Sequence, residues 1–185
     1  MDCPPEKLIG ALENSHDLTT WNKSLVKHEI IKEFPNGVKV SYQVTPESGP
    51  GGVISSRDFI LVVKQGRKGN EWMEGGCSVD YPGPESSKFV RAWNGPTGQF
   101  VRPLQDPQKV CIHKLKHVGE CLKTILDEKI KNFKELMIFF ILQCEFIWLM
   151  DCDFKGLMPG SIVDIAMPMA QFTFATCIRN LVKNL

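Results

Sequence analysis

The sequence lacks the charge bias and the local motifs that mark nucleic-acid-binding proteins and most classes of enzyme. Its 185 residues carry a net charge of only +1, and no basic run is interleaved with stacking aromatic side chains. There is no glycine-rich phosphate-binding loop and no nucleophile elbow. Asp151 and Asp153 fall on the same side of a predicted strand, but no nucleophile or base is near them. We therefore expect no catalytic residues, no cofactor and no nucleic-acid partner.

Paired cysteines and a secretory leader are also missing. The seven cysteines have irregular spacings without a CxxC pair, and an odd number cannot pair fully. The first ten residues, MDCPPEKLIG, do not combine a basic segment with an apolar one. The most apolar stretch, residues 136–150, is too short and too polar for a membrane span. We expect a cytoplasmic protein with reduced thiols and no membrane anchor.

A metal site has little support in the sequence. His113 and His117 are four residues apart, and Glu120 and Cys121 follow one turn later, so a helix could bring these side chains together as ligands. No supporting ligand occurs elsewhere. We predict that the protein holds no metal.

What is present is the hydrophobic patterning of a single α+β domain, residues 1–185. Hydrophobic residues make up 43% of the chain and charged residues 23%, an ordinary globular balance. A short helix is predicted to end near Glu13, and β-favouring runs follow, separated by turns rich in proline, glycine and asparagine. Close spacing without helical connectors favours an antiparallel meander. The predicted strands are residues 25–34, 38–44, 58–64, 72–81, 89–93, 99–104 and 146–154.

The last predicted element is a helix with Ser161 at its start. Pro168 should kink it, because proline removes a backbone donor and clashes one turn back. Beyond Pro168 the helical wheel separates an apolar arc from a polar one. Such a helix, laid across the mouth of a curved sheet, encloses a pocket. The apolar arc consists of Ala170, Phe174, Cys177, Ile178, Leu181, Val182 and Leu185.

Residues 118–142 do not fit a meander. The run is helix-like and separates two strands that would otherwise form a hairpin, whose connection usually has about two to five residues. Its end, residues 136–142, is apolar enough to form an exposed patch that favours aggregation.

Four stretches of the chain together form a recognisable pattern. They are Trp21-Asn22, residues 51–59 (GGVISSRDF), residues 89–96 (FVRAWNGP) and residues 151–159. In this order they are similar to the START family, the steroidogenic acute regulatory protein-related lipid-transfer domains. GGVISSRDF resembles the family's GG-hydrophobic-S-x-RDF signature, and FVRAWNGP resembles its VRG-x-N/H-x-P strand and turn. The similarity runs from about residue 3 to 111 and from 146 to 185, and it leans to the sterol-handling and small cytosolic branch.

The resemblance implies a helix-grip fold, in which a curved antiparallel sheet is wrapped around a long C-terminal helix with a lipid tunnel between them. It implies non-vesicular transfer of one lipid per domain, without chemistry. The branch implies a sterol such as cholesterol as ligand, and transient contact with membrane surfaces at the periphery of the cytoplasm. The tunnel agrees with the independent interpretation of the terminal helix as the lid of a pocket.

Two departures from the family pattern stand out. The family usually has a helix and three strands before the segment that matches here, so the first strands are expected to be missing and a sheet edge to be exposed. Residues 112–145 have no counterpart, and without them Val110-Cys111 would lead directly into residues 146–148. We hypothesise a retained intron or a gene-model error, which sequencing of the transcript and the protein tests. The alternative is a genuine surface helix.

The family's cavity lining, carried over position by position, falls on five residues of this chain. They are Asn94, Trp148, Phe174, Ile178 and Val182. The last three also lie on the apolar arc of the terminal helix, so two independent arguments point to them. The plainer interpretation is that these side chains simply fill a core.

The steroidogenic branch is also expected to place an acidic residue and an arginine on neighbouring strands, and here the matching positions are Gln43 and Val63. Losing both charges together avoids a buried unpaired charge. Gln43 could still hydrogen-bond a ligand hydroxyl. Alternation along residues 38–44, however, puts the valines on one face and Gln43 on the other, and periodicity alone turns the valines inward. The two arguments conflict.

Arg57 and Asp58 are interpreted as anchors of the loop at residues 46–56 rather than as lipid contacts. That loop and the kinked final helix form the candidate gate, which we expect to open at a membrane surface. Two alternatives stay open. One is a truncated or regulatory lipid-sensing fragment without transfer activity, and the other is an enzyme on the same scaffold, which would need a polar, titratable pocket.

Overall fold

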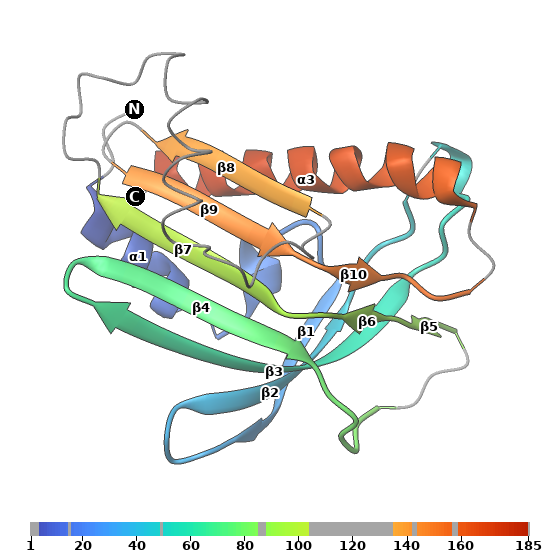
Figure 1. The fold of residues 1–185 in the computed structure, drawn as a ribbon, viewed down its shortest axis with the longest axis horizontal. Coiled ribbons are helices and arrows are strands. Elements are labelled where there is room, and N and C mark those ends of the chain that lie inside the picture. Colours follow the sequence, from blue (N-terminus) through green and yellow to red (C-terminus); the bar gives the residue numbers. More distant parts are fainter. Residues whose placement is uncertain are drawn as a thin grey trace, which may run out of the picture.

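A curved antiparallel sheet with a long helix on one side of it dominates the structure (Figure 1). The computed structural model describes residues 4–14, 16–48, 50–84, 88–103, 135–141, 144–156 and 159–184. This α+β helix-grip arrangement confirms the fold class predicted from the sequence.

The elements follow the predicted order, with strand ends that differ by a few residues. The helices are α1 (Pro5–Glu13) and α3 (Gly160–Lys183), with 3-10 turns η1 (Leu18–Thr20) and η2 (Pro50–Gly52). The strands are β1 (Lys27–Glu33), β2 (Val38–Val44), β3 (Arg57–Lys68), β4 (Glu71–Ser78), β5 (Val90–Arg91), β6 (Trp93–Asn94), β7 (Thr97–Pro103), β8 (Glu135–Ile141), β9 (Cys144–Met150) and β10 (Cys152–Asp153).

The main sheet has the order β1-β2-β3-β4-β7-β9-β8, and every neighbouring pair in it is antiparallel. The short strand β5 adds to β3 in parallel, and β6 pairs with β10 in a second, two-stranded sheet. The turn between β1 and β2 uses Gly37, whose φ of 75° is a conformation that few residues other than glycine adopt. The predicted meander is therefore confirmed for β1 to β4.

The first described segment after β7 is the strand β8, not a helix. β7 pairs directly with β9, with Pro103 opposite Cys144, and β8 then pairs with the far edge of β9. The helix-like prediction for residues 118–142 is thus wrong for 135–141, where an unbroken apolar run does not distinguish helix from strand and the open edge of β9 supplies the partner. Residues 104–134 lie outside the described part, so the hypothesis of an insertion at 112–145 stays a prediction.

Within the described residues, β1 and β8 are the two ends of the main sheet. The sequence of β1, KHEIIKE, is rich in charged residues, and Lys27 pairs with Glu29 at 2.9 Å. Charged side chains on an end strand oppose pairing with another chain.

Helix α3 runs without interruption through Pro168. The proline lacks an N–H, so the carbonyl of Asp164 has no helical donor at this point. The helix begins at Gly160, one residue before the predicted start. Both helices pack on the same face of the sheet, which we call the inner face (Figure 1).

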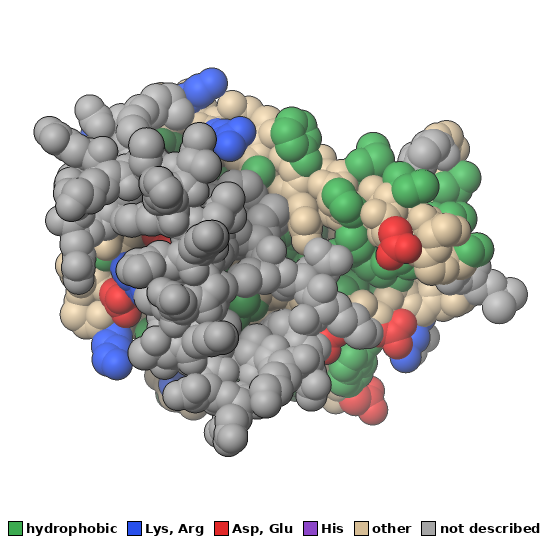
Figure 2. All heavy atoms as spheres, turned by 45° about the horizontal axis from the view of Figure 1, so that its top comes forward, with side chains coloured by type: hydrophobic (Ala, Val, Ile, Leu, Met, Phe, Trp, Pro, Cys, Tyr) green, Lys and Arg blue, Asp and Glu red, His purple; other side chains and the backbone are tan. Residues whose placement is uncertain are grey.

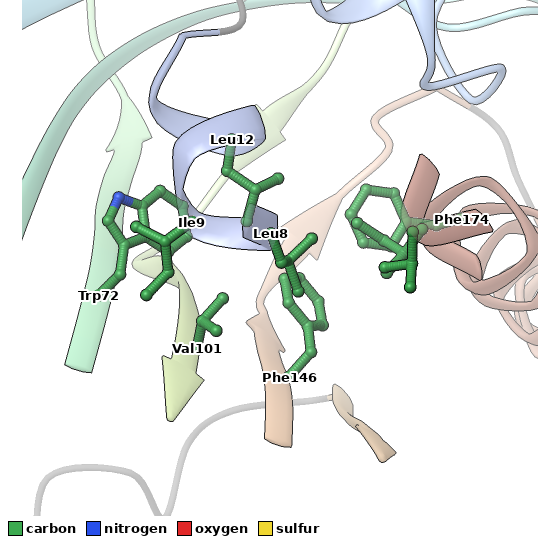
Figure 3. Close-up of a cluster of buried hydrophobic side chains, with 9 residues drawn as sticks. Leu8, Ile9, Leu12, Trp72, Val101, Phe146 and Phe174 are labelled. Atoms are coloured by element: carbon green, nitrogen blue, oxygen red, sulfur yellow. The ribbon is translucent and has the colours of Figure 1, made fainter. Parts of the chain in front are cut away.

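One end of the inner face is solidly packed, because α1 fills the space between the sheet and the C-terminal half of α3. Figure 3 shows Leu8, Ile9 and Leu12 of α1 directed at the strands and toward Phe146 and Phe174. The Phe146 and Phe174 rings lie 5.9 Å apart between centroids. We call this group the solid cluster. It consists of Leu8, Ile9, Leu12, Trp72, Val101, Phe146, Phe174, Ile178 and Val182.

The outer face of the sheet is also covered. Val40, Tyr42 and Val44 of β2 and Ile60 of β3 form a second buried cluster. Partly buried side chains pack against it, namely Ile31, Val79, Tyr81 and Phe89. Apolar side chains therefore cover β2 on the outer face of the sheet.

Candidate functional site

The inner face is hollow at the end opposite α1. A cavity of about 450 Å³ lies there between the strands, two loops and the N-terminal half of α3. This volume falls within the range of about 300–1,000 Å³ that is typical of small-molecule sites.

The walls of the cavity are mainly apolar. Its sheet side is formed by Phe59, Leu61, Val63 and Trp148, and its helix side by Val163, Ala166, Met167, Ala170 and Phe174. Pro46, Glu47, Ser48 and Ile54, from the loop before β3, also line it. The predicted gate loop and α3 thus meet over one cavity.

The cavity stops where the solid cluster begins. Glu74, Gln99 and Trp148 are neighbours in adjacent strands, and all three line the cavity. The next inward-facing row, two residues along each strand, is Trp72, Val101 and Phe146, which belongs to the solid cluster. The row of Glu74 is therefore the closed end of the cavity.

Five of the residues predicted to contact lipid come together in this cavity. They are Gln43, Val63, Asn94, Trp148 and Phe174. Ile178 and Val182 do not line it but belong to the solid cluster, one to two turns further along α3. The helical wheel identifies the buried face of a helix but not the height at which a cavity ends, so those two residues follow the plainer interpretation as core.

The structure resolves the conflict over β2. Its valines and Tyr42 point into the outer cluster, whereas Gln43 lines the cavity on the inner face. Periodicity alone turned the valines toward a core, and they do lie in one, but it is the core on the other side of the sheet. Two covered faces produce this ambiguity in any alternating strand.

Two buried polar atoms at the cavity have no hydrogen-bond partner among the described residues. They are the Ser24 hydroxyl oxygen and the Asn94 side-chain oxygen. The backbone of Asn94 is held by β6, and its N–H donates to the Ser78 hydroxyl at 2.8 Å. A buried acceptor without a donor is costly, so the Asn94 oxygen is suited to a donor group on a bound molecule.

Glu74 is a lining residue that the sequence analysis missed. Its Oε2 accepts a hydrogen bond from Gln65 Nε2 at 2.8 Å. Burial raises the pKa of the Glu74 carboxyl, and this outweighs the lowering by the Gln65 hydrogen bond and by the charge of Lys39. Alternation along β4 could have found it, because Trp72, Glu74 and Gly76 share one face, and an acid between an indole and a glycine is unusual on a buried face.

Arg57 and Asp58 lie outside the cavity lining and are buried. Arg57 donates to the carbonyl and the hydroxyl of Ser55 and, at 3.3 Å, to the carbonyl of Phe154. Asp58 accepts two hydrogen bonds from Arg91, at 3.0 and 2.8 Å. The Arg57 contacts tie the end of the 46–56 loop to the segment that precedes α3, and the Asp58–Arg91 pair ties β3 to β5.

A second loop, residues 16–26, borders the mouth of the cavity. The backbone N–H of Leu18 donates to Nδ1 of His28 at 3.3 Å, and that of Lys23 donates to Cys177 Sγ on α3 at 3.3 Å. Burial lowers the pKa of His28 more than the nearby charge of Asp17 raises it. The mouth loop is therefore attached to both β1 and α3.

Apolar side chains are exposed beside the mouth. Ile165, Met169 and Phe172 recur at helical spacing on α3, and Phe172 is 70% exposed. Val53, on the loop before β3, is 61% exposed. Figure 2 shows hydrophobic side chains gathered at this end of the molecule. We call these four residues the apolar rim.

By length and composition alone α3 could cross a membrane, with a third of its most apolar window buried. Its buried face, however, packs on the sheet and on α1.

Within the described residues no three histidine, cysteine or acidic side chains form a group that could hold a metal ion. His113, His117, Glu120 and Cys121 lie outside that part. The Asp153 carboxylate pairs with Lys155 at 2.7 Å.

Known proteins resemble this chain both in sequence and in fold. A model described as the START domain matches residues 1–184. Steroidogenic acute regulatory protein from Danio rerio is 25% identical over 171 residues, which are 91% of this chain and 48% of that protein. Human StAR-related lipid transfer protein 6 is 34% identical over 104 residues, 55% of this chain and 47% of that protein. The chain spans about half the length of these relatives.

Among solved structures, human StAR-related lipid transfer protein 5 superposes with a TM-score of 0.71 at 21% identity. The superposition covers 97% of this chain and 70% of that one. At this identity the similarity concerns the fold.

Proposed function

The chain belongs to the START domain family, and from this premise we propose that it binds one lipid in its cavity, a sterol such as cholesterol, and transfers it between membranes without vesicles. The observation that carries the proposal is the cavity itself, with apolar walls and a few polar groups between the sheet and α3. Two of the relatives named above, StAR-related lipid transfer proteins 6 and 5, are lipid-transfer proteins by their names, and we propose that this chain likewise performs no chemistry.

The energetics favour an apolar guest. A sterol buries roughly several hundred Å² of apolar surface, worth on the order of 10 kcal/mol before the cost of immobilisation. The orphan oxygen of Asn94 and the amide of Gln43 can orient a single hydroxyl group. The match to steroidogenic acute regulatory proteins, at about 25% identity, favours a sterol.

Native mass spectrometry of the purified chain, after incubation with cholesterol-containing vesicles, tests binding. We expect one sterol per chain. Transfer is measured with the fluorescent sterol dehydroergosterol, moved from donor to acceptor vesicles. A chain that stays empty with every lipid offered contradicts the carrier function and supports the fragment hypothesis.

We further propose that the protein is cytoplasmic and meets membranes transiently through the apolar rim. Four exposed apolar side chains beside the cavity mouth fit insertion among lipid headgroups. Replacing Phe172 and Ile165 by serine, two rim residues outside the cavity lining, should slow sterol transfer several-fold and leave the sterol that is already bound in place. The matched control is Phe34→Ser, an exposed apolar residue outside the rim and outside the loops at the cavity mouth. Equal loss in both variants contradicts docking through the rim.

We propose that the gate consists of the loop at 46–56 and the N-terminal half of α3, which face each other across the cavity. In a background without native cysteines, Ser48→Cys and Val163→Cys provide sites for a short bifunctional cross-linker. Cross-linking should stop transfer while preloaded sterol stays bound. Unchanged transfer by the cross-linked protein contradicts gating.

A further inference from the structure

The closed end of the cavity is polar although the cavity is mostly apolar. Gln65, Glu74, Gln99 and Trp148 stand opposite one another in successive strands β3, β4, β7 and β9. The first two share a hydrogen bond of 2.8 Å. Glu74 thus lies at the far end from the mouth, with its carboxylate held by Gln65 from one side and bordering the cavity on the other.

No cation accompanies this carboxylate inside the described lining. The only other charged side chains there are Lys23 and Glu47, both exposed at the mouth. Lys23 Nζ donates to the carbonyl of Thr19. Lys39, whose charge acts on Glu74, is paired with Glu33 at 3.4 Å and does not line the cavity. The Gln65 hydrogen bond leaves the Glu74 carboxyl group with spare hydrogen-bonding capacity toward the cavity, and in its ionised form the group is an anionic acceptor.

From this arrangement we infer that Glu74, oriented by Gln65, recognises a hydroxyl donor on the leading end of the ligand and makes the cavity selective for neutral hydroxylated lipids over lipids with a carboxylate or phosphate. The inference rests on the proposed function, since it concerns what the same cavity accepts.

Two physical effects produce the selectivity. A hydroxyl that donates to a buried carboxylate makes a charge-assisted hydrogen bond, which is stronger than a neutral one. An anionic group brought to the same place is removed from water without a cation and lies beside a like charge. A second carboxyl group could enter only with a proton, as in a carboxylate pair. The Glu74 side chain thus favours lipids with a hydroxyl donor and excludes anionic lipids.

The cavity positions near Glu74 are uncharged, so the selectivity depends on Glu74. Gln43 and Val63, where an acid and an arginine were expected in the steroidogenic branch, carry no charge here. Val63 is opposite Gly76, two residues from Glu74. The Glu74 carboxyl group has no arginine to pair with among the described lining residues.

The test uses three fluorescent probes on the full chain. Dehydroergosterol carries a hydroxyl donor, its acetate ester lacks the donor, and cis-parinaric acid carries a carboxylate. We expect the wild type to prefer dehydroergosterol to both other probes by about tenfold, the effect of roughly one strong hydrogen bond.

Two substitutions separate the two effects. Glu74→Gln keeps an acceptor but removes the charge, so binding of cis-parinaric acid should improve while the preference for dehydroergosterol over its acetate is mostly kept. Glu74→Leu removes both, so both preferences should fall by several-fold. Asp80→Asn, which removes an exposed carboxylate outside the cavity lining, is the matched control and should leave both preferences unchanged. Melting curves of all variants report whether each is folded.

The outcomes separate this inference from the proposed function. If the wild type and both folded Glu74 variants bind probes with the same preferences, the role of Glu74 is refuted and the carrier function stands. If the wild type binds none of the three probes, both are refuted.

Discussion

The two halves of α3 lie against the same face of the same sheet, yet one half is packed solidly and the other borders a hollow. In the C-terminal half, Ile178 and Val182 contact a cluster that α1 completes. In the N-terminal half, Ala166 and Ala170 line the cavity, and among the described residues no helix takes the place of α1 there. The difference therefore arises from what α1 fills, and not from the hydrophobicity of α3.

The comparison has a consequence for stability and function. Stability should depend on the solid end, where large side chains are fully buried, while ligand binding should depend on the hollow end. The substitutions below test this division, beginning with the largest expected effect.

Phe146→Ala, at the solid end, should lower the free energy of unfolding by about 3–5 kcal/mol, because it removes a fully buried ring and leaves a void. Denaturant unfolding followed by tryptophan fluorescence measures this. Phe172→Ala is the matched control, since its ring is 70% exposed, and it should change stability by less than about 0.5 kcal/mol. Similar losses in the two variants would show that the solid end is not the source of stability.

Gly76→Ala, on the strand that crosses from the solid end to the hollow end, should cost about 1–3 kcal/mol. A Cβ built at Gly76 lies 2.5 Å from the Val62 carbonyl oxygen and 2.9 Å from a methyl group of Val63, so backbone has to move. At the neighbouring Gly75 a Cβ lies 3.8 Å from the nearest atom, an ordinary contact. Gly75→Ala should therefore be nearly neutral in thermal unfolding, and an equal loss there contradicts the steric explanation.

Some of this division was predictable from the sequence and some was not. The limits of β2 agree with the prediction residue for residue, because turn residues bound the strand on both sides. The apolar arc of α3 was also found, since a helical period reports which face is buried. Neither pattern reports depth along the axis, so Ile178 and Val182 were assigned to the cavity although they belong to the solid cluster.

Two further features could be found only from the three-dimensional structure. β8 is a strand because β9 offers it an edge, and that edge exists only once the sheet has formed. Glu74 borders the cavity because α1 stops short of it, and no local pattern records where a helix distant in sequence will pack. Long-range packing thus decided what local periodicity left open.

One substitution made twice on α3 compares the two halves directly. Ala166 and Ala175 are both buried, but only Ala166 lines the cavity. Ala166→Leu should fill empty space, weaken dehydroergosterol binding by about tenfold or more, and change stability little. Ala175→Leu should overpack and cost about 1–3 kcal/mol of stability. Binding titrations and thermal unfolding of both proteins distinguish these effects, and a large stability loss in Ala166→Leu alone would reverse the assignment of the two halves.

The smallest expected effect is a pH dependence confined to the hollow end. Burial holds the pKa of folded His28 below its ordinary value of 6.5, so the unfolded chain takes up the proton first as the pH falls. Stability from this group is fully present above about pH 6.5 and is lost as the pH falls through that value toward the lower folded pKa. Protonation also removes the acceptor that holds the Leu18 N–H at the cavity mouth.

The comparison of wild type with His28→Gln between about pH 7.5 and 5.5 isolates this contribution, because other titrating groups act equally in both proteins. The wild type should lose more stability and more dehydroergosterol affinity over that range than the variant. His16→Gln, at an exposed histidine of the same loop, should retain the wild-type slope. If His28→Gln has the wild-type slope in both measurements, the mouth loop is not held through this imidazole, and the acid sensitivity of the protein belongs to carboxylates elsewhere.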